Sequence, residues 1–481
     1  MKDLNSAKVN LWSESLDSTV SSFFSVMMDV FHVLLIVRFL TQEEVGIFFF
    51  SYGFLYLFSQ VTRGYSVAIR KRATERNSNR SIYLWNGLTV IIPTLLIVFI
   101  LYAISTPFIN TYSYINLSYS VVISTFLATI GFSILELSRY YLAGCNKPGL
   151  AERVRAIMGK ITMITGTIIG LSLFPTVETA LIIVFITYTI TGIYILSLSP
   201  NEFKYPKKEV IIEILSFSKW SLPTAILNDF YHRWDTILLG FMVGYLALGY
   251  YDSSLRIAFL ATVLGVGISK TSNVKISGLF EMDKNIMKIS KQTIIASTFL
   301  VMPMLLIIYF NSEFILSNLY GSEYIAAKWY LIGITVIQIF QCYRMQFESI
   351  FNSIDNPKIT TKISGISVIF NVLTAPLFVI LFGGMGVIYS TLLSEIIRIL
   401  AYEYKFKNNF NSYILPFGVL TQIIIVIILF SIIQITDIII SLTNIELLIL
   451  STVISIIGFY SLQYLLSSET RQIVQDYRNE N

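Results

Sequence analysis

The chain contains few of the residues from which active sites and metal sites are usually built. Its 481 residues include two cysteines, Cys145 and Cys342, and two histidines. The cysteines form neither a CxxC pair nor a metal-ligand spacing, so we expect both to be reduced structural thiols. No HExxH, GxSxG or Walker sequence occurs. We therefore expect no catalytic residues, no bound metal and no enzymatic activity.

Charged residues are also scarce. They make up 13% of the chain, while 55% of the residues are hydrophobic and the mean hydropathy is +0.70. Ordinary soluble domains contain about 25% charged residues. Apolar runs of about 20 residues follow one another along the chain, which is the length that a helix needs to cross a bilayer. A transmembrane barrel would show short alternating segments instead. The composition predicts an all-α polytopic membrane protein.

The basic residues indicate how these helices are oriented. We count about fourteen spans, among them spans at about 12–39, 220–243, 413–436 and 445–466, with an interfacial helix at 210–217 and an outer connection at 311–328. With the N-terminus inside, the inner segments, which include 70–80 and 147–160, hold 26 of the 34 lysines and arginines. The outer turns hold essentially Lys328, with Arg38 at a helix end. Such an excess sets topology, so the net charge of +5 does not indicate nucleic-acid binding. We predict a multi-pass protein of the cell membrane with both termini in the cytoplasm.

An internal repeat predicts two six-helix lobes in parallel orientation. Residues 39–55 resemble 242–258, at an offset of 203, and Asn146-Lys-Pro148 resembles Asp355-Asn-Pro357, at an offset of 209. A near-constant offset is typical of transporter repeats. The predicted parts are an N-terminal lobe (1–199), a cytoplasmic connection (200–213), a C-terminal lobe (214–408), two extra helices (409–468) and a cytoplasmic tail (469–481).

Acidic side chains mark the first predicted helix. Its polar face carries Glu14, Asp29 and His32 at helical spacing, and Asp17 lies nearby. Carboxylates at membrane depth are costly and usually face a bundle interior or a watery cavity. A helix lying flat on the membrane or in water is the alternative. We assign ion coupling or a place in the cavity to Glu14, Asp17, Asp29, His32 and Asp229. Desolvation lets a buried carboxylate bind a proton near neutral pH, but hydrogen bonds to neighbouring helices explain these residues equally well. No cofactor is expected, and a proton or sodium ion is the candidate coupling ion.

Six arginines lie within or at the edge of the predicted spans: Arg63, Arg139, Arg233, Arg256, Arg344 and Arg398. Five of them have a carboxylate at helical spacing, in the pairs Glu136–Arg139, Asp229–Arg233, Asp252–Arg256, Arg344–Glu348 and Glu395–Arg398. Each pair either neutralises charge within the bundle or lines a path for a sugar-phosphate headgroup. The second interpretation rests on the planar fork of arginine, which donates two parallel hydrogen bonds to phosphate.

Arg63 differs from the other five in its sequence context. Its neighbours at helical spacing are Ser59, Gln60, Ser66 and Val67, none of which is acidic. The side chain therefore extends to the inner surface, pairs with a residue on another helix or binds an anionic ligand.

Four stretches carry a resemblance to a known superfamily. They are Arg38-Phe-Leu-Thr-Gln-Glu-Glu-Val-Gly46, Arg233-Trp-Asp235 with Leu-Leu-Gly240, Gly249-Tyr-Tyr with Arg256, and Leu319-Tyr-Gly-Ser-Glu-Tyr324. Together with the helix count they resemble the multidrug/oligosaccharidyl-lipid/polysaccharide flippases, and more narrowly the O-antigen-type polysaccharide-biosynthesis flippases. The resemblance implies a V-shaped pair of six-helix lobes around a central cavity. It also implies that a polyprenyl-phosphate-linked oligosaccharide passes from the inner to the outer face, with membrane lipids as the other partners.

Three other functions fit the sequence less well. A cation-coupled drug or metabolite efflux antiporter of the same superfamily would typically have twelve spans. A membrane-embedded glycosyltransferase or polymerase would need acidic catalytic residues or a large outer loop, yet no Asp-x-Asp sequence occurs. A scaffold without transport activity would not need charges at membrane depth.

Overall fold

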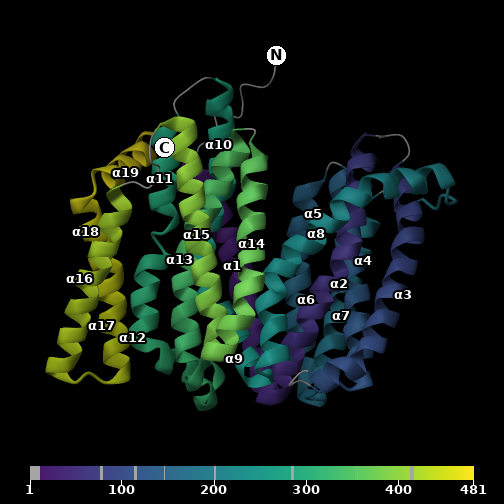
Figure 1. Cartoon of the computed structure of the whole chain (residues 1–481), viewed down its shortest axis with the longest axis horizontal. Helices are drawn as coiled ribbons and strands as arrows, with labels where there is room; N and C mark the ends of the chain where they lie inside the picture. Colours follow the sequence, from purple (N-terminus) through teal and green to yellow (C-terminus); the bar gives the residue numbers. More distant parts are fainter. Residues whose placement is uncertain are drawn as a thin grey trace. The chain divides into compact units, whose positions relative to one another are not determined.

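The computed structural model describes residues 11–75, 80–112, 116–145, 147–199, 202–282, 286–354, 356–411 and 417–480, which contain helices and no β-strand (Figure 1). The helices of the first half are α1 (Leu11–Phe39), α2 (Gln42–Glu75), α3 (Arg80–Tyr112), α4 (Tyr119–Gly144), α5 (Pro148–Val154), α6 (Lys160–Leu173), α7 (Val177–Ser197) and α8 (Lys208–Met242), with a π-helical turn at Arg155–Gly159. Those of the second half are α9 (Tyr245–Phe259), α10 (Val263–Glu281), α11 (Met287–Ser297), α12 (Val301–Tyr320), α13 (Lys328–Ser353), α14 (Pro357–Phe382), α15 (Met385–Phe410), α16 (Phe417–Ile440), α17 (Asn444–Val453), α18 (Phe459–Leu466) and α19 (Ser468–Glu480), with short 3₁₀ turns at Leu260–Thr262 and Ser322–Ala327 and a second π-helical turn at Ile454–Gly458.

Twelve helical segments of the described chain are long and apolar enough to cross a membrane. This confirms the prediction of an all-α polytopic membrane protein. The predicted number of fourteen spans is not confirmed. The two remaining predicted spans, 12–39 and 220–243, coincide with α1 and with the second part of α8, where many side chains lie outside the described residues.

The chain divides into two compact units. Residues 31–252 form one, here called the N-terminal unit, and residues 253–481 with 1–30 form the other, the C-terminal unit. Helix α8 belongs to the N-terminal unit because it packs along α2. Gly64 permits this approach, since a Cβ there would lie 2.7 Å from the Cα of Leu222. The predicted lobe boundaries, with a connection at 200–213, remain a prediction.

Both units use the same succession of helix contacts. In the N-terminal unit α4 packs on α2 and α7, and in the C-terminal unit α13 packs on α10 and α15. Helices α5 and α14 each begin at a proline, Pro148 and Pro357, where the missing N–H costs nothing. These two prolines are the residues that reveal the offset of 209 in the sequence.

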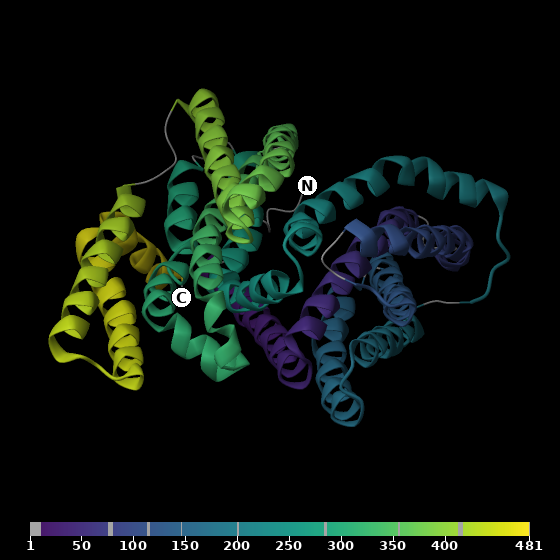
Figure 2. The same ribbon diagram turned by 60° about the horizontal axis from the view of Figure 1, so that its bottom comes forward.

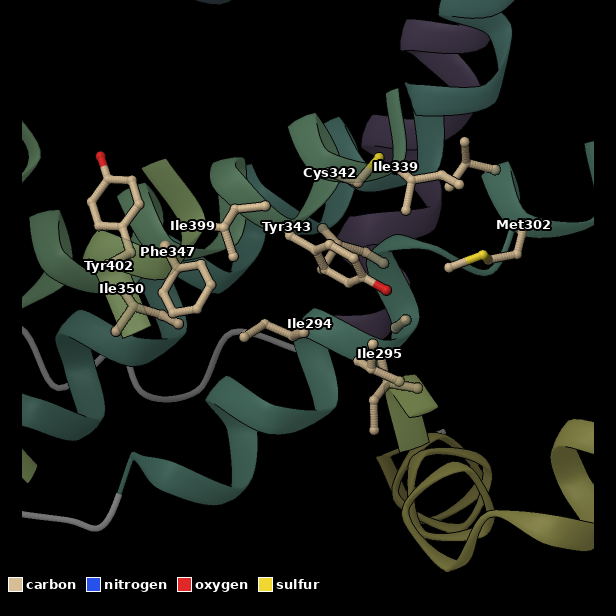
Figure 3. Packing of buried hydrophobic residues seen from close by; sticks show 14 of the residues in the cluster. Ile294, Ile295, Met302, Ile339, Cys342, Tyr343, Phe347, Ile350, Ile399 and Tyr402 are labelled. Atoms are coloured by element: carbon tan, nitrogen blue, oxygen red, sulfur yellow. The ribbon is translucent and has the colours of Figure 1, made fainter. Parts of the chain in front are cut away.

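The core of the C-terminal unit is built around α13. Its side chains Tyr343, Phe347 and Ile350 lie between residues of α11 and α15 (Figure 3). Phe347 and Tyr402 stack with 5.6 Å between ring centroids. Dispersion contacts of this kind hold helices together in lipid, where burial of apolar surface gives little advantage.

Two elements extend further than the sequence predicts. Helix α8 is one continuous curved helix that includes the predicted interfacial stretch 210–217 (Figure 2). Helix α12 continues through the predicted outer connection 311–328 as far as Tyr320. It ends there because Gly321 has φ of 105°, a conformation that glycine adopts without steric cost.

The C-terminal helix α19 is attached to α11. Lys288 Nζ lies 3.0 Å from Oδ2 of Asp476, and Gln292 donates a hydrogen bond of 2.7 Å to the same oxygen. Partial burial raises the pKa of Asp476, but these hydrogen bonds outweigh it and hold the pKa below its ordinary value. The contact joins the predicted cytoplasmic tail to the predicted inner end of a membrane span.

Candidate functional site

Arginines gather around one tyrosine in the N-terminal unit. Tyr140 on α4 accepts a hydrogen bond of 3.0 Å from Nε of Arg63 on α2. The guanidinium carbons of Arg70 and Arg139 lie 5.2 Å and 5.3 Å from the centroid of the Tyr140 ring, within the range of cation–π attraction. Three cationic side chains from two helices therefore meet at one aromatic ring.

Arg139 connects this group to α5 and the turn that follows it. Its guanidinium lies 2.9 Å from Glu136, one turn earlier on α4, and 3.1 Å from one oxygen of Glu152 on α5. The other oxygen of Glu152 lies 3.0 Å from Nε of Arg155. The Tyr140 cluster is defined here as Arg63, Arg70, Glu136, Arg139, Tyr140, Glu152 and Arg155. With four arginines and two glutamates it carries a formal charge of +2.

A glycine brings the two main helices of the Tyr140 cluster together. A Cβ at Gly144 would lie 2.9 Å from the carbonyl oxygen of Arg70. A side chain there would hold α4 away from α2. Tyr140 lies one turn before Gly144, and Arg63 lies two turns before Arg70. The close approach at Gly144 therefore places the tyrosine within reach of both arginines.

Another arginine, Arg233 on α8, contacts a tyrosine of α2. The guanidinium carbon of Arg233 on α8 lies 4.2 Å from the ring centroid of Tyr56, which is two turns before Arg63 on α2. Tyr56 also makes edge contacts with Tyr52 and Phe132, each with 5.0 Å between centroids. The side chain of Asp229, the predicted partner of Arg233, lies outside the described residues.

Two of the predicted arginines of the C-terminal unit, Arg344 and Arg398, lie in a buried network on α13 and α15. Arg344 lies 3.1 Å from Glu348 and 3.3 Å from Glu395, and Arg398 lies 3.3 Å from the other oxygen of Glu395. The side chains of Glu395 and Arg398 are 0% and 2% exposed. The four charges cancel formally. This arrangement agrees with neutralisation within the bundle, and a headgroup role for Arg344 and Arg398 remains a prediction.

Three of the five predicted ion pairs are seen among the residues that the structure describes. Glu136–Arg139, Arg344–Glu348 and Glu395–Arg398 form as the helical spacing predicts. For Asp252 the structure gives a buried carboxylate 3.4 Å from the hydroxyl of Thr236. A headgroup role for Arg256, its predicted partner, stays a prediction.

The candidate coupling residues are described only in part. Asp29 is half-buried on α1. The ring of His32 is partly buried and makes an edge contact with Phe48, with 6.5 Å between centroids. The side chains of Glu14 and Asp17 lie outside the described residues. In the part of the chain that the structure describes, no three histidine, cysteine, aspartate or glutamate side chains group closely enough to hold a metal ion.

Sequence reasoning missed four members of the Tyr140 cluster. The sequence places Arg70 and Arg155 in predicted inner basic segments and indicates no role for Tyr140 or Glu152. One available signal was the spacing of Glu152 and Arg155, which lie three residues apart shortly after the helix-starting Pro148. No sequence signal indicates that Tyr140 contacts α2, because that contact joins residues 77 positions apart.

Comparison with known proteins adds the family. The family described as "Polysaccharide biosynthesis protein" matches residues 11–274, and the family MatE matches residues 221–377. Two relatives are from Haloferax volcanii. The "Probable flippase AglR" is 28% identical over 184 residues, which are 37% of this chain and 38% of that protein. The "Probable low-salt glycan biosynthesis flippase Agl15" is 20% identical over 364 residues, 75% of this chain and 76% of that protein.

Solved structures share the fold. The lipid II flippase MurJ in an inward closed conformation superposes with a TM-score of 0.79 at 18% identity, covering 94% of this chain and 99% of that one. An inward-facing multidrug resistance MATE family transporter gives a TM-score of 0.62 at 14% identity, covering 80% of this chain and 95% of that one.

The helices and the charges buried among them define a polytopic membrane protein with the fold of the multidrug/oligosaccharidyl-lipid/polysaccharide flippase superfamily. Within that superfamily the chain belongs to the polysaccharide biosynthesis protein family, whose match covers more than half of its length. The resemblance seen in the sequence is thereby confirmed.

Proposed function

We propose that this protein is a flippase that moves a polyprenyl-phosphate-linked oligosaccharide from the inner to the outer face of the cell membrane by alternating access. The observation that carries the proposal is the Tyr140 cluster, a net positive group of side chains on membrane helices. Charge at membrane depth is costly, and a phosphate-bearing headgroup offsets that cost. Arginine suits this ligand because its fork pairs with two phosphate oxygens.

The Tyr140 cluster lies toward the ends of α2 and α4 that lead into basic segments. Helix α2 ends at Glu75 and α4 ends at Gly144, and the segments 70–80 and 147–160 hold nine of the basic residues that set the predicted orientation. A headgroup made in the cytoplasm would meet these arginines first. The hydrocarbon tail would remain in the bilayer, because its transfer into water is strongly unfavourable.

The proposal is tested by reconstitution. Purified protein in liposomes should carry a fluorescent polyprenyl-diphosphate oligosaccharide across the bilayer, and an impermeant quencher added outside should report the transfer. Liposomes without protein are the control. Transfer at the protein-free rate would contradict the proposal.

A cation-coupled efflux antiporter is the second candidate, and the match to MatE over residues 221–377 favours it. The two functions differ in electrostatics. A formal charge of +2 in the Tyr140 cluster attracts anionic headgroups and repels cationic drugs. Uptake of a cationic dye by inverted vesicles, with no transfer of the lipid-linked oligosaccharide, would favour efflux.

Orientation gives the first mutational prediction. Cysteines replacing Lys204, whose side chain is 44% exposed, and Ser322, which is exposed, should be labelled differently in whole cells by an impermeant thiol reagent. The excess of basic residues in the predicted inner segments places Lys204 inside and Ser322 outside. The natural cysteines are both buried and can remain. Labelling at position 204 in intact cells would contradict the predicted orientation, and labelling after lysis is the positive control.

Coupling to an ion gives the second prediction. Asp29→Asn should leave the protein folded, slow flipping and flatten its dependence on pH or sodium. The reason is that a carboxylate at membrane depth can bind a cation or exchange a proton, whereas an amide does neither. Transfer rates measured over pH and sodium gradients check this. An Asn variant with the wild-type dependence on both ions would make Asp29 structural.

A further inference from the structure

Two carboxylates contact Arg139, but they differ in burial. Glu136, one turn earlier on the same helix, has a side chain that is 5% exposed, whereas Glu152 on α5 is 51% exposed. A buried carboxylate beside an arginine is held firmly because leaving would expose an uncompensated charge. An exposed carboxylate is held weakly, because water and salt compete with the pair. Arg139 therefore has one permanent partner and one replaceable partner.

Glu152 bridges two arginines that are not otherwise joined by a described contact. One of its oxygens lies 3.1 Å from Arg139 and the other lies 3.0 Å from Nε of Arg155. A phosphoryl group can bridge the two arginines in the same way, since its separate oxygens can each accept hydrogen bonds from a different guanidinium group. Arg155 begins a π-helical turn in the chain between α5 and α6, and such turns are frequent at functional sites.

We propose that Arg139 and Arg155 form a phosphoryl subsite, and that Glu152 occupies this subsite as an internal anion until a ligand phosphate displaces it. The inference rests on the proposed function and deepens it, because it assigns the residues that hold each phosphoryl group of a diphosphate and the carboxylate that competes with it. One phosphoryl group replaces Glu152 between Arg139 and Arg155. The other faces Arg63 and Arg70 across the ring of Tyr140, which both arginines contact. When Glu152 is displaced, Glu136 still pairs with Arg139. The Tyr140 cluster therefore stays assembled while Arg139 and Arg155 bind the phosphoryl group.

The test measures binding by the full-length protein in nanodiscs of neutral lipid. The probes are a fluorescent polyprenyl diphosphate, the corresponding monophosphate and, as competitor, phosphatidylglycerol. Glu152→Gln removes the internal anion but keeps the shape of the side chain. We expect it to bind the diphosphate about fivefold more tightly than the wild type, as expected for the loss of one competing exposed ion pair. The gain should be smaller for the monophosphate, which has only one phosphoryl group to place.

Glu136→Gln is the matched control, because it removes the same charge from the same arginine at a buried position. It should bind the diphosphate no more tightly than the wild type, and Arg155→Gln should bind it more weakly. An equal gain in both glutamine variants would reduce the effect to net charge and overturn the subsite. Unchanged affinity for the diphosphate in Glu152→Gln would also overturn the subsite. Competition by phosphatidylglycerol as strong as that by unlabelled polyprenyl diphosphate would overturn it too, because the site would then bind lipid headgroups in general.

The flipping assay separates this inference from the proposed function. Wild-type flipping with no gain of affinity in Glu152→Gln would reject the subsite and leave the flippase. Tighter binding in Glu152→Gln with no flipping by either protein would support the subsite and reject the flippase.

Discussion

Replacing Arg63 by alanine should lower transport at least about tenfold while the protein remains folded and reaches the membrane at normal levels. Charge-assisted hydrogen bonds contribute about 1.5–3 kcal/mol, and 1.4 kcal/mol corresponds to a factor of ten. Arg63 is exposed and donates to Tyr140, so its loss removes a cation from the Tyr140 cluster without opening a core cavity. The rate of oligosaccharide transfer in liposomes measures the effect.

Arg63→Lys should retain part of the activity, because the positive charge survives and the bidentate fork does not. Arg72→Ala is the matched control, since Arg72 lies on the same helix and pairs with Glu213 at 3.2 Å. It should transport at nearly the wild-type rate.

The three interpretations of Arg63 predict different pairs of results. If Arg63 extends to the inner surface, the alanine and lysine variants both transport normally. If it is a structural partner between helices, alanine lowers the melting temperature even without substrate. The described bond to Tyr140 joins two helices, so melting must be measured beside transport. Wild-type transport by Arg63→Ala would end the ligand interpretation.

Removing the central carboxylate of the C-terminal network should have the largest effect on stability. Glu395 is fully buried and lies 3.3 Å from both Arg344 and Arg398. Glu395→Gln would remove the negative charge that both arginines contact in this buried site. Breaking a buried pair in this way costs about 3–5 kcal/mol, which should lower Tm by roughly 10 °C at about 2–4 °C per kcal/mol.

Glu348→Gln is the control for this experiment. It contacts the same Arg344, but its side chain is 24% exposed, so water replaces the lost contact and the loss of stability should be about 1 kcal/mol or less. The double variant Glu395→Gln with Arg398→Met should recover part of the lost stability, because it removes the cation together with its partner. Equal destabilisation by Glu395→Gln and Glu348→Gln would contradict the importance of burial.

The sequence by itself determined the class of the protein and the identity of the charged residues within its helices. Apolar runs of membrane length predict helices, because apart from a closed β-barrel only a helix pairs all of its backbone N–H and C=O groups in lipid. The spacing of Glu136 and Arg139, and of Glu395 and Arg398, predicted ion pairs that form. These are local relations, which helix geometry makes visible along the chain.

Only the tertiary structure decided which arginines gather into a net positive cluster and which are neutralised. Arg139 and Arg398 look alike in the sequence, each with a glutamate three residues before it. Packing brings Arg63, Arg70 and Arg155 into one cluster with Arg139. It buries Arg398 with Glu395. The contacts of Arg63 and Arg70 with Tyr140 join α2 and α4, which approach closely at Gly144. Electrostatic energy depends on distance and burial, and for residues on different helices the order of the chain specifies neither.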